Sequence, residues 1–467
     1  MLQLFVNRQQ ELLFLEEHYK TKAAELVVIY GRRRVGKTEF TIKFSSNKPH
    51  IYFLADQRPE TELIQELKQR MSLYLQNESF AKLALKDWIE LFGEFTKWNK
   101  NTHTIIIIDE FPALIEANRA VPSIFQKIWD QNLKNTPTML ILLGSSITMM
   151  ETEVLNYKSP LYGRRTAQWK LEPLKIHHLK PFFPQYNFEA LVHVYGCLGG
   201  VPAYLQKFNP QNSFWQNVQQ KILTKGEFLY EEAEFLLREE LREPRNYNII
   251  LKAIAQEAQT YGEILNKTSV DKSMLSKYSS VLEDLGFIKR THPIGITPKP
   301  RKSQYTIADN YLNFWFKYVF SNKTELEAGN SETVLNKIKQ DYNTYLGHAF
   351  EQVATELLTE MKTNHILPFT SIGKWWFKNN EIDLIALDEE KQTATFIEAK
   401  WSNLNSIDCQ RILQDLKTKA QNFRWERKKE NYAIVAKHIA DKEQLTKQGH
   451  LIFDLEDFEP TLPQDNS

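Results

Sequence analysis

The segment YGRRRVGKTEF, which overlaps the β-rich run ELVVIY, constrains the fold of this chain more than any other feature of the sequence. The spacing from Gly31 to Gly36, Lys37 and Thr38 fits the pattern G-x-x-x-x-G-K-[ST], with a predicted strand before it and a helix after it. The glycines allow a tight turn whose backbone N–H groups point at phosphate oxygens, and the helix N-terminus adds partial positive charge. We therefore interpret the three arginines as residues of a phosphate-binding loop, not as a free-standing basic patch. We expect Lys37 to reach the β- and γ-phosphates of a nucleotide and the Thr38 hydroxyl to bind Mg²⁺.

Acidic and hydroxyl side chains follow two further buried strands at their carboxyl ends. The run TIIIIDEF (104–111) carries Asp109 and Glu110, and the run TMLILLGSS (138–146) carries Ser145. Ligands of open α/β sheets bind at the carboxyl ends of the strands. We expect Asp109 to hold the Mg²⁺ and Glu110 to orient the attacking water. Ser145 either contacts that water or the γ-phosphate, or it belongs to a simple strand-to-helix turn.

The pattern of apolar residues predicts the fold class. Continuous apolar strands alternate with amphipathic helices up to about residue 170, which is typical of a parallel sheet covered on both faces. Helices follow, and between 247 and 320 the order helix, turn, helix and two short strands is that of a winged helix, with PKPRK (298–302) as the expected wing tip. This module either contacts DNA phosphates or serves as a protein-binding or intramolecular regulatory module. The segment SNKTELEAGNSE (321–332) is predicted to be a polar linker.

Composition excludes several classes of protein. A chain of 467 residues favours two to four domains, and a net charge of +1 means that any polyanion site must be local. The two cysteines lie far apart and form no C-x-x-C pattern, so neither a disulfide framework nor a zinc ribbon is expected. The N-terminus lacks a continuous apolar signal region, and no apolar run is long enough to span a bilayer. We therefore expect a cytoplasmic protein with no membrane partner.

A second cluster of acidic residues lies near the C-terminus, in NEIDLIALDEEKQTATFIEAK. The runs IDLIAL and TATFIEAK are predicted to be two strands of a hairpin, with Asp383 on the first and Glu398 and Lys400 on one face of the second. An upstream helix carries Glu351 as a further acid. Such a group can hold Mg²⁺, which lowers the pKa of a bound water, and Lys400 can position or activate the nucleophile.

Several motifs of the first 210 residues together resemble the prokaryotic AAA-related ATPases of the STAND type. They are YGRRRVGKT, IIIIDEF, LILLGSS, SPLYGRR and GGVPAYL, and they occur in the order typical of that family. The resemblance implies ATP as the nucleotide. It implies the roles given above for four residues: Lys37, Thr38, Asp109 and Glu110. It also suggests that Arg164 contacts the γ-phosphate and that Pro202 lies near the nucleotide at the start of a helical lid. A surface arginine and a simple helix start are the alternative interpretations of these two residues.

The C-terminal acids resemble the PD-(D/E)-x-K nuclease superfamily. Glu351, Asp383, Glu398 and Lys400 match its four positions, whereas EID stands where the superfamily has its Pro-Asp. The resemblance implies a restriction-endonuclease-like α/β domain, which either cleaves nucleic acid or is used only for contacts. Nearby aromatic and basic residues in GKWWFKN and KTKAQNFRWERKK either face a nucleic-acid backbone or belong to the core and to a solvated helix face.

These predictions divide the chain into four parts: a P-loop ATPase core at 1–170, a helical lid at 171–240, a winged helix at 241–320 and a nuclease-like domain at 333–467. Three hypotheses of function remain open. The first is an ATP-regulated enzyme that processes DNA or RNA. The second is a nucleotide-gated switch whose C-terminal domain only binds a partner, and the third is an ATPase that acts by assembly into a homo-oligomer.

Overall fold

The computed structural model describes residues 5–100, 102–241, 243–296, 303–363 and 367–459. The chain forms two compact units, Met1–Pro173 and Leu174–Ser467. The first unit has a five-stranded sheet, and the second has another five-stranded sheet and a two-stranded hairpin.

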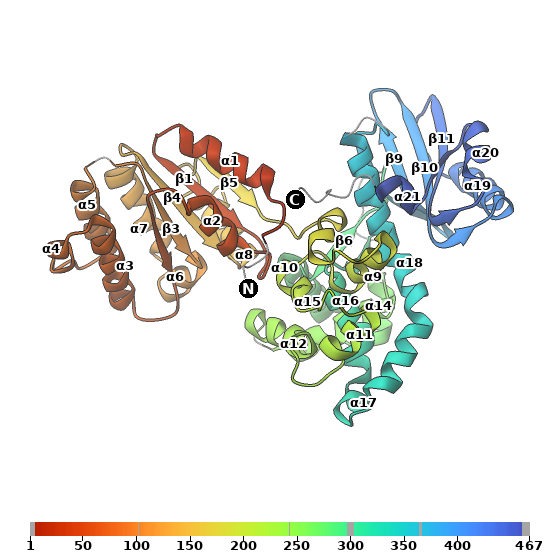
Figure 1. Cartoon of the computed structure of the whole chain (residues 1–467), viewed down its shortest axis with the longest axis horizontal. Helices are drawn as coiled ribbons and strands as arrows, with labels where there is room; N and C mark the ends of the chain where they lie inside the picture. Colours follow the sequence, from red (N-terminus) through yellow and green to blue (C-terminus); the bar gives the residue numbers. More distant parts are fainter. Residues whose placement is uncertain (1–4, 101, 242, 297–302, 364–366, 460–467) are drawn as a thin grey trace. The chain divides into compact units, whose positions relative to one another are not determined.

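The sheet of the first unit is parallel throughout, in the order β2-β3-β4-β1-β5 (Figure 1). Its central strands are buried on both faces because their sequences are continuous apolar runs. In the register of the sheet, Ile106 of β3 lies between Ile51 of β2 and Leu140 of β4. The strands are β1 (Glu25–Tyr30), β2 (His50–Leu54), β3 (Thr104–Asp109), β4 (Thr138–Gly144) and β5 (Ala167–Lys170).

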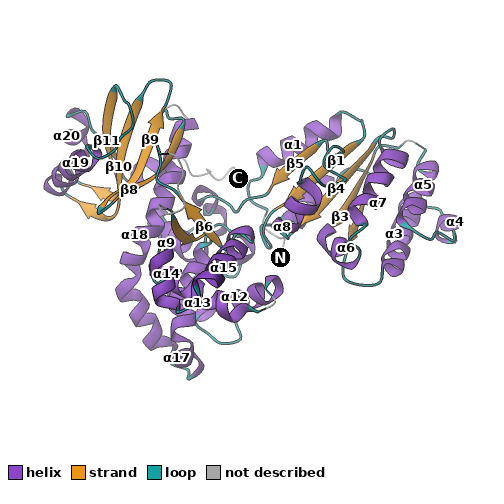
Figure 2. Cartoon of the chain, turned by 180° about the vertical axis from the view of Figure 1, so that it is seen from behind, coloured by secondary structure: helices purple, strands orange, loops and turns teal. Residues whose placement is uncertain are grey.

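Helices cover both faces of this sheet (Figures 1 and 2). Alternate residues of β1 face opposite sides: Val27 and Ile29 pack with Phe40 and Phe44 of α2, whereas Leu26 packs with α3 and α5. The predicted parallel sheet covered on both faces is thus confirmed. The helices are α1 (Gln9–Lys20), α2 (Lys37–Ser45), α3 (Glu60–Leu75), α4 (Glu78–Ala81), α5 (Trp88–Trp98), α6 (Phe111–Ala117), α7 (Val121–Ile128) and α8 (Ile147–Met149), with π-helical turns η1 (Trp129–Leu133) and η2 (Met150–Leu155).

The second unit begins with short helices and then forms three helices followed by a hairpin. Strands β6 (Ile288–Thr291) and β7 (Gln304–Ile307) pair antiparallel. The predicted wing tip, 298–302, lies outside the described residues. The helices before the hairpin are η3 (Ile176–His178), η4 (Lys180–Phe182), α9 (Phe188–Leu198), α10 (Pro202–Leu205), α11 (Phe214–Asn217), η5 (Val218–Ile222), α12 (Phe228–Glu240), α13 (Pro244–Ala255), α14 (Tyr261–Thr268) and α15 (Lys272–Asp284).

Helices also follow the hairpin, and one of them corrects a prediction. The segment 321–332 was predicted to be a polar linker, but residues 323–327 form helix α17, whose Leu326 is buried. The helices here are α16 (Asn310–Phe314), η7 (Trp315–Val319), η8 (Phe320–Asn322), α17 (Lys323–Glu327) and the long α18 (Ser331–Thr363). Helix α17 packs against η8 and α18 of the same unit.

The C-terminal sheet is mixed, in the order β12-β11-β10-β9-β8. Strands β8, β9 and β10 pair antiparallel, and β11 and β12 continue the sheet in parallel with β10. The predicted hairpin of IDLIAL and TATFIEAK is confirmed as β9 and β10. The elements are β8 (Ser371–Phe377), β9 (Asn380–Asp388), β10 (Thr393–Leu404), α19 (Ser406–Ala420), β11 (Lys429–Ile439), α20 (Lys442–Lys447), β12 (Leu451–Phe453) and α21 (Leu455–Phe458).

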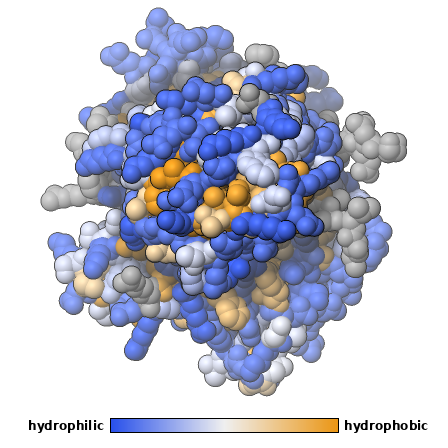
Figure 3. Space-filling model, turned by 90° about the vertical axis from the view of Figure 1, so that its left-hand side faces the viewer, coloured by the Kyte–Doolittle hydropathy of each residue, from blue (hydrophilic) through white to orange (hydrophobic). Residues whose placement is uncertain are grey.

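The surface is largely polar on the face that Figure 3 shows, where hydrophilic side chains surround a small hydrophobic patch. Within the described ranges, no helix is both long enough and apolar enough to pass through a bilayer.

Candidate functional site

The loop between β1 and α2 has the backbone that its glycines predict. Gly31 has φ +154°, and a Cβ atom there would lie 2.3 Å from the carbonyl oxygen of Leu171. Gly36 has φ +91° and is the N-cap residue of α2, where an L-amino acid with a side chain would be strained. The loop therefore turns tightly from the end of β1 into the helix N-terminus, which is the geometry that a phosphate-binding loop needs.

The Lys37 side chain lies back across this loop. Its Nζ donates hydrogen bonds to the carbonyl oxygens of Gly31 at 2.9 Å and Arg32 at 3.0 Å. Burial lowers the pKa of Lys37 to about 8, although the Glu110 and Asp109 carboxylates act in the opposite direction. This buried ammonium can also donate charge-assisted hydrogen bonds to an anion that binds in the loop.

Thr38 and Asp109 lie side by side at the end of the sheet. The Thr38 hydroxyl donates to Asp109 Oδ2 at 2.6 Å, and the Tyr52 hydroxyl donates to the same oxygen at 2.8 Å. Burial and the Asp109 carboxylate raise the pKa of Tyr52 well above its usual range, so the phenol stays a donor. Asp109 is 2 % exposed and is thus held in one orientation. Tyr52 was not predicted, because nothing in the run HIYFLA distinguishes it from a core aromatic residue.

Glu110 and Ser145 form a second pair beside the first. The Ser145 hydroxyl donates to Glu110 Oε2 at 2.7 Å, and the backbone N–H of Glu110 donates to Asp109 Oδ1 at 2.9 Å. Glu110 has φ +53°, so the chain turns sharply as it leaves β3. The loop, Asp109, Glu110 and Ser145 are brought together at the carboxyl edge of the parallel sheet, which agrees with the predicted arrangement.

Arg164 pairs with an acid in this structure. Its Nη2 lies 3.1 Å from Asp130 Oδ2, and its Nη1 donates to the carbonyl oxygen of Pro160 at 3.3 Å. A contact between Arg164 and the γ-phosphate therefore requires that this ion pair be broken, and it stays a prediction. Pro202 occupies the first turn of α10, as a simple helix start requires.

The C-terminal acids meet where two strands of the hairpin face helix α18. Asp383 lies on β9 and Glu398 and Lys400 on β10, and Lys400 Nζ lies 2.7 Å from Glu398 Oε1 and 3.5 Å from Asp383 Oδ2. Asp383 Oδ2 also accepts the backbone N–H of Ala399 at 2.9 Å. Burial, together with Glu398 and Glu351, raises the pKa of Asp383 to about 6. Burial alone would lower the pKa of Lys400, but the two acids outweigh it and raise that pKa, so the ammonium is charged.

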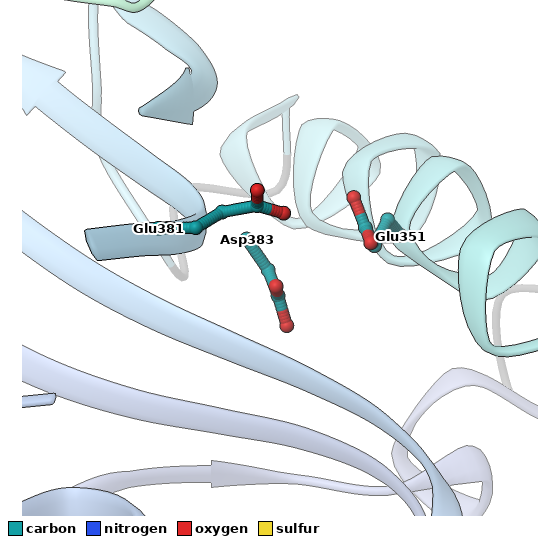
Figure 4. Close-up of side chains that lie close together, drawn as sticks. All are labelled: Glu351, Glu381 and Asp383. Carbon is teal, nitrogen blue, oxygen red and sulfur yellow. The ribbon is translucent and has the colours of Figure 1, made fainter. Parts of the chain in front are cut away.

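Two further charged residues join this cluster. Glu381 of β9 lies two positions before Asp383. One carboxylate oxygen from each of Glu351, Glu381 and Asp383 lies within 4.8 Å of the other two (Figure 4). Lys374 of β8 contacts Glu351 at 3.0 Å and Glu381 at 2.5 Å. Neither Glu381 nor Lys374 was predicted; the two-residue spacing of Glu381 and Asp383 on one strand was the available signal for the first.

The donor set fits a divalent cation. Glu398 Oε2 is buried and has no hydrogen-bond partner among the residues that the structure describes, although Glu398 Oε1 is paired with Lys400. An ionised carboxylate oxygen buried without a partner is costly. Hard carboxylate oxygens are the ligands that Mg²⁺ prefers, so Asp383 and Glu398 are suited to hold it.

The fold and the loop geometry of the first unit define a P-loop ATPase domain. A family profile described as an ATPase domain predominantly from Archaea matches residues 5–208, and a profile of archaeal and bacterial proteins of unknown function matches residues 315–412. An uncharacterized protein of Methanocaldococcus jannaschii, MJECL04, is 43% identical over 457 residues, which are 97% of this chain and 100% of that protein. The chain belongs to the family of this relative, and its residues 5–208 match the ATPase-domain profile.

A solved structure agrees with the fold. The Walker-type ATPase of Pyrococcus abyssi has a TM-score of 0.50 and 22% identity, over 67% of this chain and 96% of that chain. At this identity the similarity shows the fold alone. A STAND protein of Pyrococcus horikoshii with a tetratricopeptide repeat sensor has a TM-score of 0.32 and 16% identity, over 77% of this chain and 50% of that chain. The STAND type stays a prediction for this chain.

Proposed function

We propose that the chain is an ATP-dependent enzyme that processes nucleic acid: ATP binding and hydrolysis in the first unit regulate a metal-dependent nuclease site in the C-terminal sheet. The ATPase part is supported by the family and by the loop geometry. The observation that carries the nuclease part is the juxtaposition of Asp383, Glu398 and Lys400 on one hairpin, with an unpartnered buried oxygen of Glu398.

In the ATP site, each residue has a separate role. Lys37 exchanges its bonds to the loop carbonyls for the β- and γ-phosphates, and the Thr38 hydroxyl and Asp109 hold the Mg²⁺. Glu110, oriented by Ser145, aligns the attacking water. Arg164, once released from Asp130, contacts the γ-phosphate and stabilises the charge that develops on it.

In the nuclease site, Asp383 and Glu398 hold the cation and Lys400 positions the nucleophile. A bound Mg²⁺ or Mn²⁺ supplies a water of lowered pKa and a counter-charge for the phosphate. Glu351 contributes a further carboxylate from α18, and the Asp383 side chain, fixed by the Ala399 N–H, gives the site one rigid ligand.

The intervening segments are proposed to report the nucleotide state. Residues 171–240 form a helical lid and 241–320 a winged helix, whose elements α13, α14, α15, β6 and β7 follow the winged-helix order. In this proposal 333–467 is a restriction-endonuclease-like domain, and the winged helix acts as an intramolecular module.

A paired assay tests the proposal. ATP hydrolysis and cleavage of single- and double-stranded DNA and RNA are measured on one preparation, with Mg²⁺ or Mn²⁺ and with or without ATP. We expect Asp383→Asn to abolish cleavage and to leave ATP hydrolysis unchanged, because the two sites lie in separate units. Glu389→Gln, in the turn after β9, removes an exposed carboxylate from the same domain and should retain both activities.

A lack of cleavage by the wild-type chain would decide against the nuclease part of the proposal. If the wild-type chain hydrolyses ATP but cuts none of these substrates with either metal, the nuclease part is wrong. The chain is then a nucleotide-gated switch whose C-terminal domain binds a partner.

A further inference from the structure

Lys374 of β8 lies beside the C-terminal acids, at an irregular point of the sheet. It lies on β8 where the pairing with β9 is interrupted, since the register shifts between Gly373 and Trp375. Its Nζ lies 3.0 Å from Glu351 Oε2 and 2.5 Å from Glu381 Oε1. Burial acts to lower the pKa of Lys374, but the two carboxylates outweigh it, so the ammonium stays charged. The charged ammonium of Lys374 thus lies between the carboxylates of Glu351 and Glu381. Both acids belong to the cluster that could hold a metal ion.

A segment after β6, residues 292–296, contacts the backbone of this lysine. We name it the hairpin arm. The backbone N–H of Ile294 donates to the carbonyl oxygen of Lys374 at 2.9 Å, and the Ile294 side chain packs against the apolar core of the C-terminal sheet. The next residue, Gly295, has φ +73°, and a Cβ atom there would lie 2.7 Å from the buried ring of Phe423. The hairpin arm therefore fits closely against the sheet at the position of Lys374.

A second connection links the helices before the hairpin to the same acids. His348 of α18 lies 3.8 Å from Glu257, in the connection between α13 and α14, and 3.9 Å from Glu351. Lys317 of η7 also contacts Glu257, at 3.3 Å. The segment from α13 to β7, which contains the hairpin arm, thus reaches the acid cluster in two ways. Ile294 bonds the backbone of Lys374, and Glu257 lies near His348, which in turn lies near Glu351.

We propose that the Lys374 ammonium competes with a divalent cation for the carboxylates of Glu351 and Glu381, and that the hairpin arm holds it in place. The inference rests on the proposed metal-dependent function of Asp383 and Glu398. A cation held by Asp383 that also takes carboxylate oxygens of Glu351 and Glu381 must displace the ammonium from those two acids. The position of the hairpin arm then sets the metal affinity of the site. Movement of the arm would then switch the site between a lysine-filled and a metal-binding arrangement.

Titration of Mn²⁺ into the full-length protein tests the role of Lys374. Lys374→Met removes the charge and keeps the apolar stem, and we expect it to lower the dissociation constant for Mn²⁺ tenfold or more. Lys419→Met is the control for the loss of one positive charge near the cluster. Lys419 lies 3.8 Å from the proposed ligand Glu398, so a small gain in affinity is expected, but it does not bridge Glu351 and Glu381 and the gain should stay well below that of Lys374→Met. An unchanged or weaker affinity in Lys374→Met, or an equal gain in Lys419→Met, overturns the competition. If Lys374→Met does not fold, Lys374→Gln gives the same comparison.

A double-mutant cycle tests the hairpin arm. Gly295→Ala pushes a Cβ atom into the Phe423 ring. Gly329→Ala is the control, because Gly329 has a similar φ of +84° but open space where the Cβ atom would lie. We expect Gly295→Ala to tighten Mn²⁺ binding threefold or more in the wild-type chain and to have no effect in the Lys374→Met background. An effect equal to that of Gly329→Ala, or one of the same size in both backgrounds, overturns the role of the arm.

The two proposals fail in different ways. If no variant and no wild-type protein binds Mn²⁺, the metal-dependent function itself is wrong. If the wild type binds Mn²⁺ and the substitutions at Lys374 and Gly295 change nothing, only the inference about the internal cation is wrong.

Discussion

The lowered pKa of Lys37 predicts how ATP affinity depends on pH. Lys37 is 6 % exposed, and burial lowers its pKa to about 8. Phosphate oxygens favour the charged ammonium, so the nucleotide complex holds this proton more tightly than the free protein does. Affinity for Mg-ATP must therefore decrease as the pH rises through about 8.

The size of the effect follows from the charged fraction. At pH 7 about nine tenths of the Lys37 side chains are protonated, and at pH 9 about one tenth are. If only the charged form holds the phosphates, the observed Kd is the intrinsic Kd divided by this fraction. We expect the Kd for Mg-ATP to rise about tenfold between pH 7 and pH 9, a change of about 1.4 kcal/mol.

Isothermal titration with Mg-ATP at pH 7, 8 and 9 measures this change, and Lys37→Arg is the control. A guanidinium stays charged over this range, so the substitution should remove the pH dependence of Lys37 and keep any that arises from ATP itself. Lys37→Met should bind weakly at every pH. If the Kd of the wild type changes no more than that of Lys37→Arg, the buried ammonium does not act as described.

Three further substitutions test the ATP site. Glu110→Gln should retain Mg-ATP binding but slow hydrolysis about 100-fold, and single-turnover rates equal to wild type would exclude its role with the water. Tyr52→Phe removes one hydrogen bond to Asp109 and should weaken Mg-ATP binding by about fivefold, as one bond of about 1 kcal/mol predicts. An unchanged Kd by titration calorimetry would show that Thr38 and the Glu110 N–H orient the acid without Tyr52. Arg164→Ala should lower the ATP turnover number more than ADP affinity, and equal hydrolysis rates would leave Arg164 as a surface residue.

Much of the fold follows from local patterns in the sequence. The apolar runs of β3 and β4 predict strands buried on both faces, because only a sheet covered by helices buries every residue of such a run. The two-residue spacing of Glu398 and Lys400 likewise predicts that they share a face of one strand, and the 2.7 Å contact between them agrees.

Contacts between distant segments could not be predicted in this way. Tyr52 and Asp109 are 57 positions apart, and their hydrogen bond depends on the pairing of β2 with β3, which no local pattern specifies. Lys374 lies at the register shift of β8 and meets Glu351, which is 23 positions away on a helix, and no local pattern specifies either feature. Helix α17 was missed for a related reason: one buried residue, Leu326, outweighs the polar composition of its segment.

The central claim is that Asp383 and Glu398 together hold a divalent cation, and anomalous diffraction from crystals soaked in Mn²⁺ tests it most directly. We predict an anomalous peak at saturating Mn²⁺ that is bound by carboxylate oxygens of both residues, including the buried Oε2 of Glu398, which has no hydrogen-bond partner among the described residues. The peak should disappear in Asp383→Asn crystals. The absence of a peak between Asp383 and Glu398 in the wild type would contradict the claim and leave the two acids as structural residues.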